Sequence, residues 1–296
     1  MKEDTYSSGL GAIGFIGAGK VGFSMGKYLS DNGEHLSGYY SRTQESAEQA
    51  ATFTGAKAFD NIRDLVNSSD TLFITVPDKE ISGVWDCMRK ACDLKGKTVL
   101  HMSGASTCAL FSGIIDTGAY GFSLHPLCAV SDRYQSHETL STAVFTIEVS
   151  ESSDETYNLK ANAIRIAMTH AGNTIVDIRP EDKVLYHAAA VVASNMTVGL
   201  VFMAEQMLKR TGFTDEEASK ALSPLIKGTM DNILRQGSVS ALTGPVERND
   251  VETVSKHLTK LTEQEIEVYK VLTKTLIDIG KIRHEDADYS GMEELL

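Results

Sequence analysis

Three glycines near the start of the chain have a spacing that suits phosphate binding. They occur in Gly17-Ala18-Gly19-Lys20-Val21-Gly22, which directly follows an apolar run and opens a helical pattern. The first glycine permits a tight turn, the second lets the backbone approach a pyrophosphate, and the third lets helix and strand pack closely. The helix N-terminus adds free amides and the positive end of its dipole. The pattern therefore favours dinucleotide binding over an ordinary glycine turn.

The end of the second predicted strand bears on which dinucleotide binds. An acidic residue there would accept hydrogen bonds from the ribose 2′-hydroxyl and repel a 2′-phosphate. This chain instead has Ser41, Arg42 and Thr43, with no acid before Glu45. Arg42 could stack on adenine or bind the phosphate, and the two hydroxyls could donate to it. We predict NADP(H); the alternative is a solvated arginine beside a helix-capping Thr43.

Two further strand ends are expected to face the cofactor, because ligands lie at the carboxyl ends of parallel strands. Val76, Pro77 and Asp78 end one strand, where the proline keeps the turn stiff. Ser103 and Gly104 end the next, and the glycine allows a close approach near the nicotinamide half. The alternative for both is simple turn chemistry.

Two histidines lie at or near predicted strand ends. His125, followed by Pro126, comes directly after the predicted strand 121–124. An imidazole at that end can donate or accept a proton near neutral pH, although many histidines are only structural. His101 lies inside a predicted strand, so we expect it to be buried and hydrogen-bonded.

A polar stripe runs along a predicted long helix from Pro180 to about Arg210. Lys183, His187 and Ser194 fall on one narrow face of it, and Asn195 lies at the edge. In a carbonyl reduction the developing alkoxide needs a proton or a cation. We predict His187 as the general acid, with Lys183 a weaker candidate, Asn195 to orient the substrate and Ser194 to bind it. The alternative is a solvated Lys183 and a packed His187.

The segment 241–250 is a third candidate region. Gly244-Pro245 makes a rigid turn, and polar residues flank it. We predict that Thr243 and Arg248 bind substrate, with Arg248 holding a carboxylate through both arms of its guanidinium. The alternative is that Arg248 pairs with Asp250 and that the segment only caps the next helix.

The elements that position these residues alternate over the first part of the chain. Short apolar runs predict strands, and helical patterns separate most of them. The predicted strands are 12–16, 36–40, 56–59, 71–76, 98–102, 121–124, 144–149 and 174–178. This alternation predicts an α/β Rossmann fold with a doubly wound, mostly parallel sheet.

The second part of the chain is predicted to be all-helical. Helices are expected over about 180–210, 215–235, 251–258 and 262–281, followed by a loosely held acidic tail, 284–296. We predict an NADP-binding domain over residues 1–179 and a helical substrate and dimerisation domain over 180–296. The length of 296 residues with 42% hydrophobic content agrees with about two domains.

Composition limits the partners. The net charge is 28 − 40 = −12, and an acidic surface repels phosphate backbones, so we expect no nucleic acid. No uninterrupted apolar run of about 18 residues occurs, so we expect no membrane span. Lys2, Glu3 and Asp4 disfavour a signal peptide.

Four cysteines form no CxxC pair. We expect them to be reduced thiols of a cytoplasmic protein that serve as small core hydrophobes, and we expect no metal site.

The sequence resembles the Rossmann-like candidate NADP oxidoreductases that carry a helical C-terminal domain of unknown function. The matching stretches are Gly14–Gly22, Val76-Pro77-Asp78, His101–Gly104, Ser123–Leu127, His187–Ala190, Ser194-Asn195 and Ala241–Arg248. That family is similar to pyrroline-5-carboxylate reductase, ketopantoate reductase and the β-hydroxyacid dehydrogenases. The resemblance implies an N-terminal NADP domain, a helical dimerisation domain and a site between them.

The resemblance carries less information about the reaction. The β-hydroxyacid dehydrogenases have a lysine with an asparagine four residues later, whereas here His187 follows Lys183 at that spacing. His125-Pro126 is similar to a pair in prephenate dehydrogenases. We expect an oxidoreductase that uses NADP(H) on a small carboxylate-bearing carbonyl, hydroxy or imine compound. The alternatives are a prephenate-type dehydrogenase and an NADP-binding sensor or scaffold without turnover.

Overall fold

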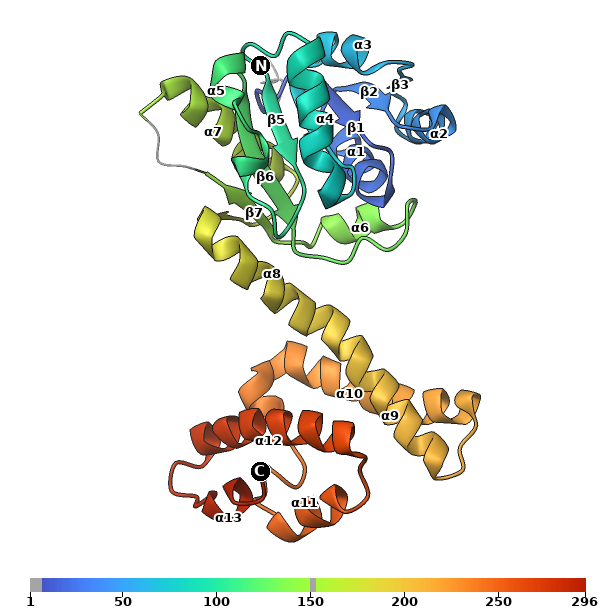
Figure 1. The fold of residues 1–296 in the computed structure, drawn as a ribbon, viewed down its shortest axis with the longest axis vertical. Helices are drawn as coiled ribbons and strands as arrows, with labels where there is room; N and C mark the ends of the chain where they lie inside the picture. The colour runs from blue at the N-terminus through green and yellow to red at the C-terminus, as the bar shows by residue number, and fades with distance from the viewer. Residues whose placement is uncertain (1–6, 150–152) are drawn as a thin grey trace, which may run out of the picture. The chain divides into compact units, whose positions relative to one another are not determined.

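The computed structural model describes residues 7–149 and 153–296 (Figure 1). By its internal contacts the chain divides into unit 1, Met1–Asn195, and unit 2, Met196–Leu296, which we treat separately. The predicted division into domains over residues 1–179 and 180–296 stays a prediction. Lys2, Glu3 and Asp4, on which the expectation about a signal peptide rests, lie outside the described residues.

Unit 1 is built on one eight-stranded sheet with the order β3-β2-β1-β4-β5-β6-β7-β8. Only the pairing of β6 with β7 is antiparallel among the described strands. The bounds are β1 Ile13–Ile16, β2 Leu36–Tyr40, β3 Lys57–Ala58, β4 Thr71–Ile74, β5 Thr98–His101, β6 Tyr120–Pro126, β7 Phe145–Glu148 and β8 Ile175–Ile178. The predicted α/β fold with a mostly parallel sheet is confirmed.

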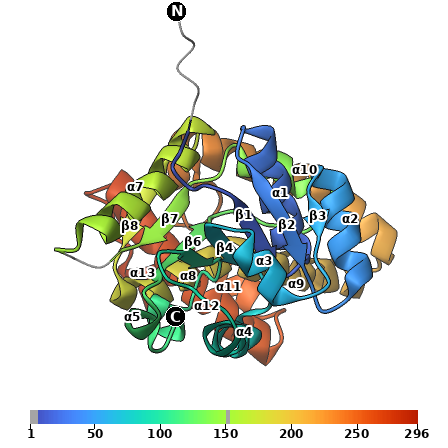
Figure 2. The same ribbon diagram turned by 90° about the horizontal axis from the view of Figure 1, so that it is seen from above.

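Helices cover both faces of this sheet (Figure 2). They are α1 Lys20–Asp31, α2 Gln44–Thr54, α3 Ile62–Asn67, α4 Asp78–Ala91, α5 Ile114–Thr117, α6 Ser136–Leu140 and α7 Glu155–His170. Successive residues of a strand point to opposite faces, so Phe15 of β1 packs in the core that contains α1, α2 and α7, whereas Ile16 packs in the core that contains α3 and α4. Each face thus has its own apolar core.

From β1 the chain adds β2 and β3 on one side of the sheet, and it then crosses to add β4 and the later strands on the other side. In open sheets of this kind the loops after the two strands at the crossing, here β1 and β4, diverge and leave a crevice at the carboxyl ends. The glycine loop follows β1 and the Val76-Pro77 turn follows β4, so both border this edge.

The last helix of unit 1 brings the predicted polar stripe to the sheet. A short 3-10 turn, Pro180–Asp182, leads into α8, Lys183–Val191, and a π-helical turn follows over Val192–Met196. Such turns shift the register of side chains and occur often at functional sites. The division between the two units falls inside this turn.

Unit 2 is helical, as predicted. It contains α9 Thr197–Arg210, α10 Asp215–Ala241, α11 Val251–Leu258, α12 Glu263–Arg283 and α13 Ser290–Glu293. Thr214 and Thr262 begin α10 and α12 with capping boxes, each pairing with a glutamate three residues later. Helix α10 runs beyond the predicted end at residue 235, with a kink at Gly237, whose φ is 82°.

Two predictions were wrong. The C-terminal tail is not loosely held, because Tyr289 and Met292 are 2% and 0% exposed in the core of unit 2. Its acidic composition concealed these apolar contacts. The cysteines are free, but Cys87 is exposed and the other three are only partly buried, so Cys87 is no core residue.

The helical stretch Pro180–Arg210 is long and apolar enough, by length and composition, to cross a membrane. Its best 18-residue window has a mean hydropathy of 1.5, and none of that window is buried. Exposed apolar side chains on the stretch include Val184, Leu185, Val198 and Phe202.

Candidate active site

The glycine loop after β1 has the conformation that its spacing predicts. Gly17 has a φ of 106°, and a Cβ there would lie 2.9 Å from the Thr75 backbone. A Cβ on Gly22 would lie 2.3 Å from the Gly17 carbonyl oxygen. At Gly19, in contrast, a Cβ would meet nothing within 4 Å. The first and third glycines therefore permit close packing, and the second faces open space at the N-terminus of α1.

The predicted 2′-phosphate residues lie at the open end of β2. Arg42 and Thr43 are exposed and Ser41 is partly buried. Thr43 is the N-cap residue of α2, but its hydroxyl donates to Ser46 Oγ at 2.8 Å rather than capping a backbone amide. Arg42 forms no hydrogen bond or ion pair within the described residues, so its guanidinium is available to a ligand.

The turns after β4 and β5 are joined by a hydrogen bond. Ser103 Oγ donates to Asp78 Oδ2 at 2.6 Å and accepts from the Ser106 amide at 3.0 Å. Pro77 is exposed at the start of α4 and Val76 is partly buried. The predicted cofactor residues Val76, Pro77, Ser103 and Gly104 therefore form one continuous edge.

Two imidazoles meet at Gly104. A Cβ on this glycine would lie 2.8 Å from His187 Nδ1 and 2.9 Å from His125 Nε2. The two rings are perpendicular within 10°, with centroids 6.3 Å apart. His187 Nδ1 is buried and has no hydrogen-bond partner among the described residues. Nε2 of His101 and Nδ1 of His137 are likewise buried without a partner among the described residues, so it is the meeting with His125 at Gly104 that distinguishes His187.

Tyr186, which the sequence interpretation missed, hydrogen-bonds to His125. Its hydroxyl lies 2.8 Å from His125 Nδ1, and Thr146 hydrogen-bonds to the same phenol. Burial raises the pKa of Tyr186, so the phenol stays protonated, and the direction of its hydrogen bond with Nδ1 follows the tautomer of His125. Burial, followed by the charges of Lys183 and His187, lowers the pKa of His125 to about 4. His125 is therefore neutral at pH 7, and its Nε2 is the nitrogen that faces Gly104.

Lys183 is placed inside the protein. It is 1% exposed, and its ammonium donates to the Ser103 carbonyl at 3.2 Å and to Ser123 Oγ. It also pairs with Glu148 Oε2 at 3.4 Å, while Glu148 Oε1 accepts from the Cys108 amide at 2.9 Å. Burial lowers the pKa of Lys183, and the Glu148 carboxylate opposes that shift. This lysine thus ties the start of α8 to β6, β7 and the turn after β5.

His101 has the structural role that the sequence favours. It is 0% exposed, and its Nδ1 accepts a hydrogen bond from the Ser103 amide at 3.2 Å. Burial lowers its pKa to about 4.

The predicted substrate residues lie in two places. Ser194 and Asn195 are exposed in the π-helical turn of unit 1, where Ser194 Oγ donates to the Ala190 carbonyl at 2.9 Å. Thr243 and Arg248 are exposed in unit 2. Asp250 caps α11 by accepting from the Thr253 amide, and it forms no ion pair with Arg248 within the described residues.

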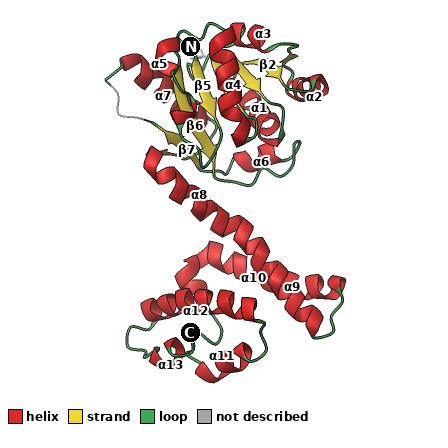
Figure 3. Cartoon of the chain, viewed as in Figure 1, coloured by secondary structure: helices red, strands yellow, loops and turns green. Residues whose placement is uncertain are grey.

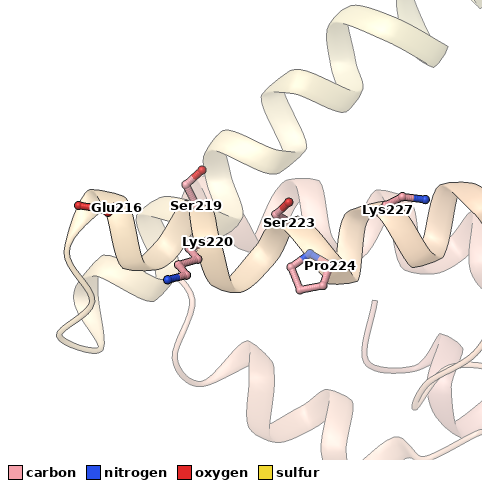
Figure 4. A pocket seen from close by; sticks show the side chains of 6 residues that line it. All are labelled: Glu216, Ser219, Lys220, Ser223, Pro224 and Lys227. Atoms are coloured by element: carbon pink, nitrogen blue, oxygen red, sulfur yellow. The ribbon is translucent and has the colours of Figure 1, made fainter.

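Surface hollows elsewhere do not contain the predicted catalytic residues. One lies along α10 and is lined by side chains of that helix alone, so a ligand in it would be held from one side (Figure 4). A second, of about 410 Å³, includes His35 and Asp70 at the amino edge of the sheet. A third, of about 220 Å³ inside unit 2, is mostly apolar, with Tyr269 and Leu276 beside the predicted Thr243.

The chain matches two family models. Residues 3–126 match the Rossmann-like domain, and residues 145–276 match a domain of unknown function, DUF2520. The chain joins a Rossmann-like domain to a DUF2520 domain. The resemblance inferred from the glycine, His125-Pro126 and His187 stretches is thereby confirmed. The comparison with curated proteins found no match.

Solved structures of similar fold span almost the whole chain. A protein from Thermotoga maritima has a TM-score of 0.73 and 24% identity, over 92% of this chain and 99% of that one. A candidate NADP oxidoreductase from Bacteroides fragilis has a TM-score of 0.69 and 22% identity, over 92% and 100%. A pyrroline-5-carboxylate reductase from Coxiella burnetii has a TM-score of 0.60 and 15% identity, over 92% and 98%. At these identities the likeness establishes the fold.

Proposed function

We propose that this protein is an NADP(H)-dependent oxidoreductase acting on a small carbonyl, hydroxy or imine compound that carries a carboxylate. The observation that carries the proposal is the meeting of two imidazole nitrogens at Gly104, on the same sheet edge as the glycine loop. Proton-transferring groups and a dinucleotide loop at one edge are what hydride transfer requires.

The residues of this edge fit a nicotinamide dinucleotide. The open side of Gly19 and the N-terminus of α1 suit the pyrophosphate, with Ala18, Lys20 and Val21 contributing the loop backbone. Ser41, Arg42 and Thr43 suit a 2′-phosphate, because none of them is acidic and the guanidinium is exposed. The Val76-Pro77 and Ser103-Gly104 turns would border the nicotinamide half. The bound cofactor supplies or accepts the hydride.

The protein's own part is to hold and move a proton. A ring nitrogen of His187 exchanges the proton with the substrate oxygen or nitrogen, and neutral His125 donates a hydrogen bond through Nε2. We propose that the Tyr186 hydroxyl donates to Nδ1 and so keeps His125 in that tautomer. Lys183 is a positioning residue, since its ammonium is occupied by Ser103, Ser123 and Glu148.

The carboxylate preference rests on Arg248. This exposed arginine has no ion pair within the described residues and can bind a carboxylate through two parallel hydrogen bonds. Thr243 and Ser194 are each proposed to bind substrate, and Asn195 to orient it. The name of the pyrroline-5-carboxylate reductase, one of the proteins of similar fold, includes such a group.

A substrate panel tests the proposal. Small oxo acids and cyclic imino acids are mixed with NADPH, and the loss of reduced nicotinamide is followed by absorbance. We expect turnover with at least one class, abolished in His187→Ala and retained in His35→Ala, an exposed histidine at the opposite sheet edge. Tight NADPH binding without any consumption would instead support a sensor or scaffold. Release of carbon dioxide would support a prephenate-type dehydrogenase.

We further propose a homodimer formed through the helical segments. Leu225, Leu234 and Phe202 are 64%, 84% and 61% exposed, which is unusual for isolated soluble units. A second copy is favoured over a lipid bilayer, because the first turn of α8 is fixed among strand ends by Lys183. The compartment is proposed to be the cytoplasm, since the four cysteines are free. Light scattering should give twice the chain mass, and Phe202→Glu should give monomers.

A further inference from the structure

An arginine outside the predicted site lies against the glycine loop. Arg133 belongs to the loop between β6 and α6, a helix that packs beside α1 (Figure 1). Its Nη2 donates to the Ala18 carbonyl at 2.5 Å and its Nη1 donates to Gln49 Oε1 at 3.1 Å. The guanidinium lies over the Phe23 ring, 5.2 Å from the centroid. Three elements therefore hold this cation beside the loop.

The charge of Arg133 is not balanced by a carboxylate. It forms no ion pair within the part of the chain that the structure describes. The neighbouring Asp132 uses its Oδ1 to accept from the amides of Tyr134 and Gln135, at 2.7 and 2.9 Å. Glu45 reaches only the Gln49 amide group, at 3.1 Å. The partly buried guanidinium is thus held by neutral oxygens and an aromatic face.

The surroundings add positive rather than negative potential. Ala18 is followed by Gly19 and the exposed Lys20, which opens α1, so the positive end of the helix dipole lies next to the guanidinium. A cation here is electrostatically unfavourable in the empty protein and favourable once an anion binds. The guanidinium has further N–H groups beyond the two that bond to Ala18 and Gln49.

We propose that Arg133 binds the pyrophosphate of the dinucleotide, as a cation supplied to the glycine loop from the β6–α6 connection. The inference rests on the proposed function and extends it, because no sequence pattern in the glycine motif points to residue 133. Its bond to Ala18 assigns it to the loop that faces the pyrophosphate. Arg42, at the end of β2, is assigned to the 2′-phosphate.

The two assignments predict different losses of affinity. Nucleotide fluorescence measures the dissociation constants of NADPH and NADH for the wild type, Arg133→Met, Arg133→Gln, Arg133→Lys and Arg42→Met. Loss of the Arg133 charge should weaken both nucleotides by the same factor, about 10-fold to 100-fold, as expected for a charge-assisted hydrogen bond. Arg133→Lys should keep most of the affinity. Arg42→Met should weaken NADPH alone.

Matched controls separate binding from loop structure. Arg63→Met removes an arginine that likewise donates to a backbone carbonyl, that of Ala91 at 3.0 Å, and it should change neither constant. Gln49→Leu removes a partner of Arg133 without changing the charge, so it should change both constants less than Arg133→Gln does. Arg133→Gln retains a side-chain N–H that can donate to the Ala18 carbonyl. This variant replaces Arg133→Met in the measurement if the methionine variant does not fold.

The outcomes are distinct. If Arg133→Gln leaves the dissociation constants of NADPH and NADH unchanged, or weakens the binding of NADPH alone, the assignment of Arg133 to the pyrophosphate is overturned. The proposed function would remain intact. A lysine variant as weak as the glutamine variant would show a purely structural role. A wild type that binds neither nucleotide would overturn the proposed function and this inference together.

Discussion

Replacing Lys183 by methionine tests whether this residue holds the site together. The substitution keeps the length and apolar stem of the side chain but removes the ammonium. Glu148, 3% exposed, would then be a buried carboxylate without its counter-ion. The carbonyl of Ser103 and the hydroxyl of Ser123 would also lose a donor. We expect a large loss of stability in unit 1.

The magnitude follows from the geometry. At the separation of 3.4 Å between Nζ and Oε2, two unit charges attract by about 5 kcal/mol at an effective dielectric constant of about 20. Breaking a buried ion pair by removing one partner typically costs about 3–5 kcal/mol. Whole domains are stable by about 5–15 kcal/mol. The change should therefore consume a large part of the stability of unit 1 without abolishing the fold.

The single tryptophan provides a local probe. Trp85 in α4 is 0% exposed and lies in a core of unit 1, so its fluorescence reports the unfolding of this unit. In urea, with a slope of about 2 kcal/mol per molar, Lys183→Met should lower the midpoint by about 1.5–2.5 M. The double variant Lys183→Met with Glu148→Leu replaces the pair by apolar groups and should recover most of the loss.

Two results would refute the reasoning. If Lys183→Met lowers the free energy of unfolding by less than about 1 kcal/mol, the pair with Glu148 contributes no more than an exposed charge pair does. Lys183 would then be hydrated and free to act on a ligand. A double variant no more stable than Lys183→Met would mean that the cost does not come from the unpaired carboxylate.

Three other perturbations have defined outcomes. Gly104→Ala places a Cβ 2.8 Å from His187 Nδ1 and should lower turnover about 100-fold with little change in melting temperature. Unchanged turnover would mean that His125 and His187 take no part in the reaction. Tyr186→Phe removes the donor to His125 Nδ1, so nitrogen NMR should show mixed tautomers instead of the Nε2–H form; a mixture already in the wild type would contradict the assignment. The Arg210 guanidinium, followed by the Thr262 amide, lowers the pKa of Glu265 from 4.5 to about 2. The ionised Glu265 therefore contributes fully to the stability of unit 2 above pH 4.5, and this contribution is lost as the pH falls toward 2. In Glu265→Gln the urea midpoint of unit 2 should depend less on pH between 4.5 and 2 than it does in the wild type.

Much of the fold follows from local patterns. The strand Leu36–Tyr40 and the helix Val251–Leu258 have the predicted bounds, and Asn61 caps α3 by accepting from the Asp64 amide. These elements are set by residues close together in sequence, through apolar alternation and cap chemistry. The convergence of Gly104 and His125 also follows from sequence, because parallel strands end at one edge.

The environment of α8 could not be predicted in the same way. A lysine in a first helical turn is normally solvated, and its burial depends on Glu148 and Ser123, which lie on separate strands far away in sequence. Tyr186 precedes the predicted His187 and falls outside the polar stripe, so only the packing of α8 against β6 shows its bond to His125. Periodicity identifies a face of a helix but not its partner.

The most direct test of the central claim is a pair of nucleotide titrations followed by fluorescence. We expect the wild type to bind NADPH more tightly than NADH, and we expect Arg42→Ala to remove the difference. Equal affinities in the wild type, or no binding of either nucleotide, would contradict it.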